Sequence, residues 1–185
     1  KPSEVLYDTL GKLKKTNDKP TFKRLLGGLT VGDAGGAMVI QKNTEEGRGL
    51  KWMQSFSEGA YTNLCYWKYA ADGSVDGQML MKEISVQIVR LHKQLIDDTY
   101  QNLGWEPKDV DKIYSHQVGE KPHKALAQMA GKPLEYAPVT YPRFGNLTSA
   151  TIPVCMYLHP PKKGDHALIC GTGSGLSVSQ AGVVF

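Results

Sequence analysis

The chain has 185 residues, of which 41% are hydrophobic and 22% are charged, and it contains 20 glycines. This composition is typical of one or two globular domains with a sizeable core, and it excludes disordered and collagen-like chains. The net charge is only +4. The basic segment KLKKTNDKPTFKR has neither interleaved aromatic residues nor a recognition motif, so we expect a solvated surface and no nucleic-acid partner.

The three cysteines, Cys65, Cys155 and Cys170, are odd in number and widely spaced. This spacing argues against a disulfide framework and against a zinc site of the CxxC type, and it fits a reducing compartment. No apolar run approaches the ~20 residues that a membrane span requires, and no signal segment opens the chain. We therefore expect a cytoplasmic protein without a membrane span.

The first 80 residues alternate between ordered and irregular patterns. Residues 1–15 predict an amphipathic helix, and because no methionine opens the chain we expect a longer polypeptide. Small residues lead into AMVI, residues 37–40, which has the pattern of a buried strand, and the segment from Leu50 predicts its partner strand. Residues 60–80 are aromatic and dotted with glycine, without a clear period, which predicts a long functional or mobile loop.

The strongest helical pattern covers residues 81–103, where Ile84, Ile88, Leu91 and Leu95 recur at intervals of four, three and four. Gly104 follows as a stop signal. Further along, we expect a strand at 112–114, a helix after residue 116, a strand at 134–140, a helix at 146–158 and two closing strands at 166–173 and 176–185. This order predicts an α/β layer with a largely parallel sheet.

His116 would stand at the carboxyl end of the strand at 112–114. In α/β sheets this edge opens onto the ligand crevice, so a polar side chain there can reach a substrate. The alternative is a histidine that only caps the loop.

Two further polar features follow in the sequence. Asn146 precedes a run of small residues and is either a helix N-cap or an amide donor to a substrate oxygen. The segment CGTGSGLS places Gly171, Gly173 and Gly175 between two strands, either for a tight turn or to bring backbone N–H groups against a ligand. Its spacing is not that of a dinucleotide fingerprint.

The order of SHQVG, RFGNLTSATIP and ALICGTGSGLSVSQAGVVF resembles the C-terminal half of the β-ketoacyl-ACP synthase III branch of the thiolase superfamily. TVGDAGGAMVI is similar to the strand that closes the N-terminal half in that family. The resemblance implies a thiolase-like α/β fold, a C-terminal βαβαβ-type half with a mixed five-stranded sheet that packs on a missing N-terminal half. Residues 1–45 would be the tail of the N-terminal half and residues 46–185 the C-terminal domain. The GSGL form, with Ser174 in place of a glycine, is similar to that of the olefin-pathway enzymes, which join two acyl chains head to head.

The resemblance implies a Claisen condensation of acyl thioesters without a cofactor, the substrates being thioesters of coenzyme A or of the phosphopantetheine of an acyl carrier protein. His116 Nε2 and the Asn146 side-chain amide would stabilise the enolate oxygen, with a neutral imidazole that donates from Nε2. The loop of Gly173, Ser174 and Gly175 would border the acyl-cysteine. Lys121 would receive an acidic carrier protein or the phosphates of coenzyme A, or else be a solvated helix start.

The nucleophilic cysteine of the family lies in the other half, so we expect this chain to be catalytically incomplete alone. Its partner would be an N-terminal thiolase-like half, from the same polypeptide or a separate subunit, and the complete unit would be a homodimer. The local cysteines are interpreted as small buried hydrophobes, with Cys170 the least implausible exception because it adjoins the glycine loop. Two other functions stay open: a non-catalytic subunit that shapes an acyl tunnel or docks a carrier, and a thioester hydrolase with His116 as general base.

Overall fold

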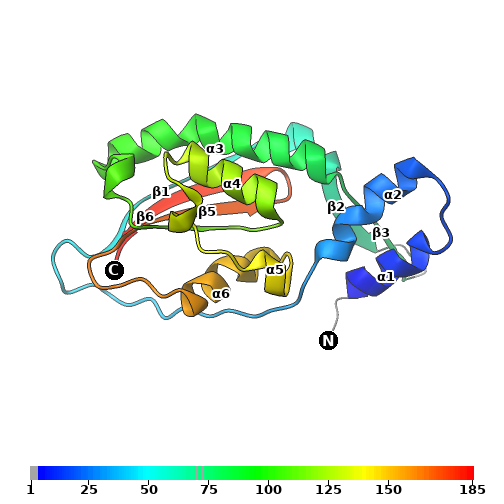
Figure 1. Cartoon of the computed structure of the whole chain (residues 1–185), viewed down its shortest axis with the longest axis horizontal. Coiled ribbons are helices and arrows are strands. Elements are labelled where there is room, and N and C mark those ends of the chain that lie inside the picture. Colours follow the sequence, from blue (N-terminus) through cyan, green and yellow to red (C-terminus); the bar gives the residue numbers. More distant parts are fainter. Residues whose placement is uncertain (1–3, 70, 72) are drawn as a thin grey trace.

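The structure is a computed structural model that describes residues 4–69, 71 and 73–185. Its centre is a four-stranded sheet in the order β1-β6-β5-β4 (Figure 1). The strands are β1 (Gly49–Ser57), β4 (Lys112–Ser115), β5 (His166–Gly173) and β6 (Ser177–Val184). Strands β4 and β5 are parallel, whereas β6 is antiparallel to both β5 and β1.

The expected α/β class and mixed sheet are confirmed, but two details are wrong. The described part of this sheet has four strands instead of five, and β4 with β5 is its one parallel pairing, so the sheet is not largely parallel. The reason lies in the connections. Strand β6 follows β5 through a tight glycine loop and must therefore return antiparallel, since a parallel strand requires a crossover of a dozen or more residues.

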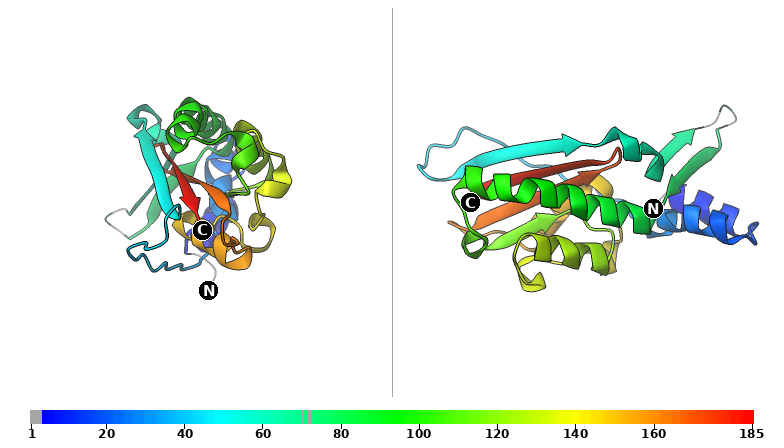
Figure 2. Two further views of the ribbon diagram at one scale, coloured as in Figure 1. Left: turned by 90° about the vertical axis from the view of Figure 1, so that its left-hand side faces the viewer. Right: turned by 90° about the horizontal axis from the view of Figure 1, so that it is seen from above.

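Helix α3 (Met81–Leu103) has the predicted bounds and runs along one face of the sheet (Figure 2). It ends at Gly104, which has φ 65° and donates its N–H to the carbonyls of Tyr100 and Gln101. Its apolar stripe is buried against the sheet through Ile88, Leu91 and Ile96. Each such side chain contributes about 1.5–3 kcal/mol when fully buried.

The remaining helices cover both faces of the sheet. Helix α4 (Glu120–Met129) lies beside α3, whereas α5 (Tyr141–Phe144) and α6 (Thr151–Leu158) lie on the opposite face (Figure 1). Strand β5 alternates accordingly: Leu168 belongs to the core under α3 and α4, and Ala167 belongs to the core against α6. Its apolar run is therefore buried from both sides, as expected for strands between two helical layers.

A smaller unit lies beyond the amino-terminal end of α3, at Met81 (Figure 1). It combines α1 (Glu4–Leu13), α2 (Lys19–Leu25) and a 3-10 turn, η1 (Leu26–Thr30), with an antiparallel hairpin of β2 (Cys65–Tyr69) and β3 (Val75–Met79). Within this unit, Arg24 of α2 joins the helices to the hairpin. Its guanidinium binds the Asp76 carboxylate at 3.0 Å and the carbonyl of Gly77 at 3.1 Å. The helix expected at residues 1–15 is confirmed over Glu4–Leu13, and residues 1–3 lie outside the described residues. The expectation of a long loop at 60–80 is wrong for the described residues, most of which form a 3-10 turn and the hairpin. Residues 70 and 72 lie outside the described residues.

Two predicted strands are absent from the described residues. Residues 37–40 are extended but unpaired, and Val39 and Ile40 are 95% and 93% exposed. Residues 134–140 form a 3-10 turn, η4 (Leu134–Tyr136), and irregular backbone. Side chains satisfy this backbone in place of a neighbouring strand: Gln117 donates to the carbonyl of Pro138 at 2.8 Å, and His123 donates to that of Ala137 at 3.0 Å.

The described helices include none whose length and apolar character would suit a membrane crossing.

Candidate active site

Strand β4 delivers His116 one residue past its carboxyl end, as predicted. The backbone N–H of His116 continues the ladder with the carbonyl of Cys170 at 3.0 Å. On the ring, Nδ1 lies 3.1 Å from the carbonyl oxygen of Thr148. A carbonyl only accepts hydrogen bonds, so Nδ1 carries the ring proton.

This partner determines what the other ring nitrogen offers. In the neutral imidazole, a proton on Nδ1 leaves a lone pair on Nε2. Burial lowers the pKa of His116, and the hydrogen bond to Thr148 opposes this in part, so the neutral form is favoured near neutral pH. The expectation that a neutral His116 donates from Nε2 is therefore wrong. The ring donates from Nε2 only after Nε2 has accepted a proton.

Asn146 is held by a segment far away in sequence. Its backbone N–H donates to the carbonyl of Thr30 at 2.7 Å, and its carbonyl accepts from the N–H of Gly32 at 2.9 Å. The approach requires a glycine at position 145, because Gly145 has φ 69° and a Cβ there would lie 2.4 Å from the carbonyl oxygen of Thr30. The Asn146 side chain is thereby fixed at only 3% exposure.

The two ends of the Asn146 amide have different surroundings. Oδ1 accepts from the N–H of Thr148 at 2.9 Å, which closes a local turn. The expectation of a helix N-cap is wrong, because the N-cap positions of the two helical segments that follow are Leu147 and Ala150. Nδ2 has no hydrogen-bond partner among the described residues, and Asn146 lines a cavity together with His116. Nδ2 is therefore available as a donor to a bound molecule.

Thr148 connects the two polar side chains. Its N–H binds Asn146 and its carbonyl binds His116, so one residue orients both. Thr148 has φ 52°, a positive φ that is unusual for a β-branched side chain. Backbone strain of this kind costs about 1–3 kcal/mol and concentrates at functional sites.

The glycine loop between β5 and β6 lies against the segment that follows β1. Leu176 exchanges two backbone hydrogen bonds with Glu58, at 2.8 and 3.0 Å. The carbonyl of Gly175 accepts from Thr62 Oγ1 at 2.8 Å, and Ser174 Oγ donates to Cys65 Sγ at 3.4 Å. Gly173 and Ser174 reach the cavity that His116 lines, whereas Gly175 is absent from its lining.

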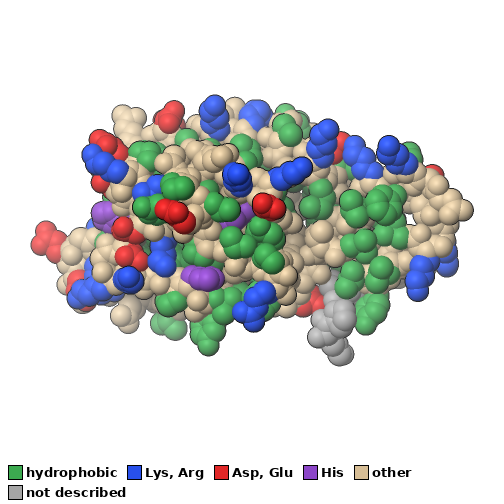
Figure 3. Space-filling view, in the orientation of Figure 1, with side chains coloured by type: hydrophobic (Ala, Val, Ile, Leu, Met, Phe, Trp, Pro, Cys, Tyr) green, Lys and Arg blue, Asp and Glu red, His purple; other side chains and the backbone are tan. Residues whose placement is uncertain are grey.

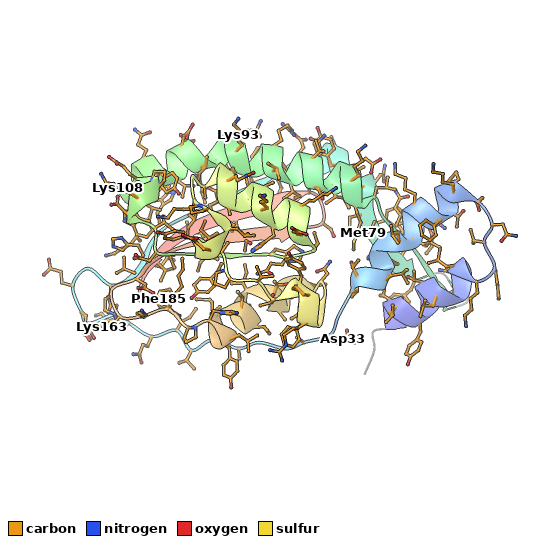
Figure 4. The ribbon with its side chains drawn as sticks, viewed as in Figure 1. Asp33, Met79, Lys93, Lys108, Lys163 and Phe185 are labelled. Carbon is orange, nitrogen blue, oxygen red and sulfur yellow. The ribbon has the colours of Figure 1, made fainter. Side chains whose placement is uncertain are left out.

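The cavity has a volume of about 430 Å³ and lies where the sheet meets the small N-terminal unit. Met79, at this junction in Figure 4, forms part of its wall. Its apolar wall further includes Trp67, Ile84, Ile88, Leu126 and Leu176. Such a mostly apolar cavity with a few polar groups is typical of small-molecule sites.

A second hollow, of about 450 Å³, opens on the α6 face of the sheet and shares His116 with the first. Small residues form most of its floor, namely Ser55, Ser57, Gly171, Gly173, Ser177 and Ser179. His116 therefore lies between an apolar cavity and a shallow surface on which another backbone can approach closely.

Two of the three cysteines are small buried residues as expected, and Cys65 is not. Cys170 is completely buried, and burial raises the pKa of its thiol to about 12; Cys155 is also buried, with a pKa of about 11. Cys170 is therefore an inert core residue, although it adjoins the glycine loop in sequence. Cys65 is the partly exposed cysteine and lines the same cavity as His116 and Asn146. No pattern in the sequence indicated this, because β2 was not predicted.

A buried polar chain supports Thr172, which lines both hollows. Gln180 Nε2 donates to the carbonyl of His92 at 2.8 Å and lies 3.3 Å from His92 Nδ1, so the ring proton is on Nε2, which donates to Thr172 Oγ1 at 3.1 Å. Gln180 Oε1 accepts in turn from Thr99 Oγ1. The sequence analysis missed this support, since its members are separated by up to 88 residues.

Lys121 is exposed in the first turn of α4 and is absent from the cavity lining, although the next residue, Pro122, belongs to it. Its assignment to a carrier protein or to phosphates stays a prediction.

Residues 100–184 match the family described as 3-oxoacyl-[acyl-carrier-protein (ACP)] synthase III C terminal. The β-ketoacyl-[acyl-carrier-protein] synthase III of Methylococcus capsulatus is 30% identical over 132 residues, which cover 68% of this chain and 40% of that protein. The acyl-CoA:acyl-CoA alkyltransferase of Xanthomonas campestris is 24% identical over 169 residues, which cover 89% of this chain and 49% of that protein.

A crystal structure of OleA from Xanthomonas campestris shares the fold, with a TM-score of 0.80 at 21% identity. The match covers 98% of this chain and 53% of that one. The chain thus spans about half the length of the relatives that it matches. Residues 100–184 therefore form a β-ketoacyl synthase III-like C-terminal domain, and the chain has a thiolase-like α/β fold.

Proposed function

We propose that this chain supplies the polar side of a site that condenses acyl thioesters by a Claisen reaction. The observation that carries the proposal is the convergence of His116 and Asn146 on one apolar cavity, both oriented by Thr148. The names of the relatives, a β-ketoacyl synthase III and an acyl-CoA:acyl-CoA alkyltransferase, support the class of reaction. Thioesters of coenzyme A or of a carrier protein would be the substrates, with no cofactor.

In this proposal the two residues have different roles. Asn146 Nδ2 donates to the thioester oxygen from the start, and its donation strengthens as the oxygen becomes an enolate. His116 begins neutral, with a lone pair on Nε2, and becomes a second donor once Nε2 has accepted the α-proton that the thioester loses as its enolate forms. The imidazolium then faces the enolate oxygen with opposite charge inside an apolar cavity, where such an attraction is strong.

The nucleophilic cysteine would come from a partner half with the complementary thiolase-like fold. Two features support such a partner. Residues 37–40 present exposed apolar side chains on an extended, unpaired backbone, the form that adds to a sheet edge. The floor of small residues beside His116 would let a helix of the partner approach closely enough to bring its amino-terminal cysteine to the acyl group.

Exposed apolar side chains on α6 lie on the same side of the sheet as the floor of small residues. Tyr157 is 84% exposed, and apolar atoms are visible below α6 in Figure 3. Apolar exposure of this kind marks an interface more often than free surface.

The test is reconstitution. This chain would be produced together with the segment that precedes it in the full polypeptide or with a co-encoded thiolase-like half, and the condensed product would be measured by mass spectrometry. His116→Ala or Asn146→Ala should lower condensation by about two to three orders of magnitude and leave acylation of the partner's cysteine intact.

Unchanged condensation in both variants would refute the assigned roles and favour a subunit that only shapes the cavity. Release of free acid without a longer carbon chain would favour a thioester hydrolase.

A further inference from the structure

A chain of side-chain hydrogen bonds crosses the core from the edge strand β1 to the cavity. Its first link is Gln54, whose Nε2 donates to Thr99 Oγ1 at 2.7 Å. Thr99 Oγ1 donates to Gln180 Oε1 at 2.6 Å, and Gln180 Nε2 lies 3.3 Å from His92 Nδ1. His92 Nε2 lies 3.1 Å from Thr172 Oγ1, at the cavity wall. The middle of the chain, from Thr99 to His92, is completely buried, so water does not compete for its hydrogen bonds.

Two backbone carbonyls fix the direction in which these hydrogen bonds run. Gln54 Nε2 also donates to the carbonyl of Leu95 at 3.0 Å, and Gln180 Nε2 donates to that of His92 at 2.8 Å. Because a carbonyl only accepts, the nitrogen end of each amide is assigned. His92 Nδ1 therefore accepts from Gln180, and the ring proton lies on Nε2, which donates to Thr172. Every link donates toward the cavity.

This direction leaves the hydroxyl proton of Thr172 for an acceptor in the cavity. Its oxygen accepts from His92, and among the described residues the Thr172 side chain makes no other hydrogen bond. Thr172 follows Cys170 by two positions in β5 and so shares its face of the sheet, which α3 and α4 cover. Ile88 of α3 and Leu126 of α4 line the cavity on this face. An oxygen atom of a bound molecule would complete the chain.

The cavity thus presents three polar atoms with a definite pattern. Asn146 Nδ2 and the Thr172 hydroxyl are donors, whereas Nε2 of neutral His116 is an acceptor. All three residues line the same, mostly apolar cavity. A carbonyl oxygen satisfies one donor, and a hydroxyl group satisfies the other donor and the acceptor together, because it both accepts and donates. A plain acyl thioester has only the carbonyl and would leave two of the three atoms without partners.

We propose that Thr172 is a specificity-determining residue, through which the cavity selects an acyl thioester with a hydroxyl group on carbon 2 or carbon 3, close to the carbonyl. The thioester carbonyl accepts from Asn146, and the hydroxyl accepts from Thr172 and donates to His116. His92 is a positioning residue, since it determines which way the Thr172 hydroxyl donates. The choice of a thioester rests on the proposed function, whereas the preference for a hydroxyl rests on the polar atoms of this chain.

The experiment compares the binding of decanoyl-CoA, 2-hydroxydecanoyl-CoA and 3-hydroxydecanoyl-CoA to the full 185-residue chain. Isothermal titration calorimetry measures the dissociation constants. At least one hydroxylated probe should bind about 10-fold more tightly than decanoyl-CoA, because its hydroxyl adds hydrogen bonds to Thr172 and His116 that the plain chain lacks.

Two variants at position 172 make the comparison specific. Thr172→Val keeps the shape of the side chain and removes the hydroxyl, so the preference for the hydroxylated probe should disappear. Thr172→Ser is the matched control and should retain most of the preference. Thermal unfolding followed by circular dichroism reports whether both variants are folded. If Thr172→Val does not fold, the wild-type affinities and the spectra of His92 still decide.

The positioning role of His92 has a readout of its own. In nitrogen-15 NMR spectra its ring should carry the proton on Nε2, with Nδ1 bare. The Nε2 resonance should shift when the preferred hydroxylated probe binds, because Thr172 then donates to the probe and becomes a better acceptor. The same probe should leave this resonance unmoved in Thr172→Val. A proton on Nδ1 would overturn the assigned direction of the chain.

Equal affinity for all probes, tighter binding of decanoyl-CoA, or an unchanged preference in Thr172→Val would overturn the proposal. Failure of the folded wild-type chain to bind any of the probes would overturn it as well. None of these results bears on condensation of unhydroxylated thioesters in the reconstituted enzyme, so failure of this proposal is distinguishable from failure of the proposed function.

Discussion

Replacing His92 by glutamine should remove a large part of the acid sensitivity of this fold. His92 is completely buried, and burial lowers its pKa to about 4 from the ordinary value of 6.5. The structure shows why the ring resists protonation: Nδ1 already faces the Gln180 amide, which donates, and Nε2 donates to Thr172. A second ring proton would point at another donor.

The size of the effect follows from the two pKa values. The unfolded chain binds the proton near pH 6.5 and the folded chain near pH 4, so the unfolded state carries more protons between them and falling pH favours unfolding. The difference between a pKa of 6.5 and one of about 4 corresponds to roughly 3 kcal/mol in full, and about 2 kcal/mol of this is lost between pH 7.5 and pH 5. The stability is present above the unfolded pKa and is lost as pH falls toward the folded one.

Urea unfolding at about pH 7.5 and pH 5, followed by circular dichroism, measures the difference for the wild type and for His92→Gln. The pKa values of His116 and His123 are lowered as well, so both proteins should lose stability in acid. The wild type should lose about 2 kcal/mol more than the variant. Equal losses in the two proteins would refute the assignment of a neutral, buried His92.

Three further predictions concern the site and its supports. Gly145→Ala should destabilise the chain by at least about 2 kcal/mol in urea unfolding, because φ is positive and the new Cβ meets the Thr30 carbonyl. Gly164→Ala is the matched control and should cost less, because Gly164 also has a positive φ, 88°, but open space around it. Gln117→Leu should cost roughly 2–5 kcal/mol, because the Pro138 carbonyl and the Thr140 N–H lose their partner; unchanged stability would contradict the hydrogen-bond assignment. In nitrogen-15 NMR spectra, neutral His116 should show a protonated Nδ1 and a bare Nε2, and the opposite tautomer would contradict the role of Thr148.

The sequence predicted those elements whose pattern is repeated and whose ends carry a signal. Helix α3 has a stripe over its whole length and a glycine at its end, so its bounds were predicted correctly. Strands β4 and β5 are apolar runs that both helical layers bury, which leaves little alternative to a central sheet.

The predictions were wrong where tertiary contacts, and not the local pattern, determine the secondary structure. Residues 134–140 have the composition of a strand, but Gln117 and His123 satisfy their backbone, so no ladder forms. Residues 66–69 and 75–79 looked irregular because polar and glycine residues interrupt them. The hairpin depends on Trp67 covering Gly77, where a Cβ would lie 2.1 Å from the indole ring. A packing requirement of this kind leaves no periodic pattern in the sequence.

The positions of the candidate site residues in the fold were predictable, but the hydrogen bonds that decide their chemistry were not. The sequence places a histidine after a strand and an asparagine before small residues, yet it does not indicate which atom of Thr148 meets each of them. Because a carbonyl oxygen lies at Nδ1, Nε2 of neutral His116 is a hydrogen-bond acceptor. An N–H group at Nδ1 would instead have placed the ring proton on Nε2 and made that atom a donor.

The same contact therefore links the backbone strain at Thr148 to the polarity of the cavity. The positive φ of Thr148 turns its carbonyl toward the imidazole while its N–H remains on Asn146. The result is one acceptor and one donor, with unlike polarity, on a single apolar cavity. Under the proposed function, a resting thioester carbonyl, which only accepts, would match Asn146 alone. A species with a transferable proton next to a developing oxyanion would match both, so the arrangement would favour the reacting state over the bound substrate.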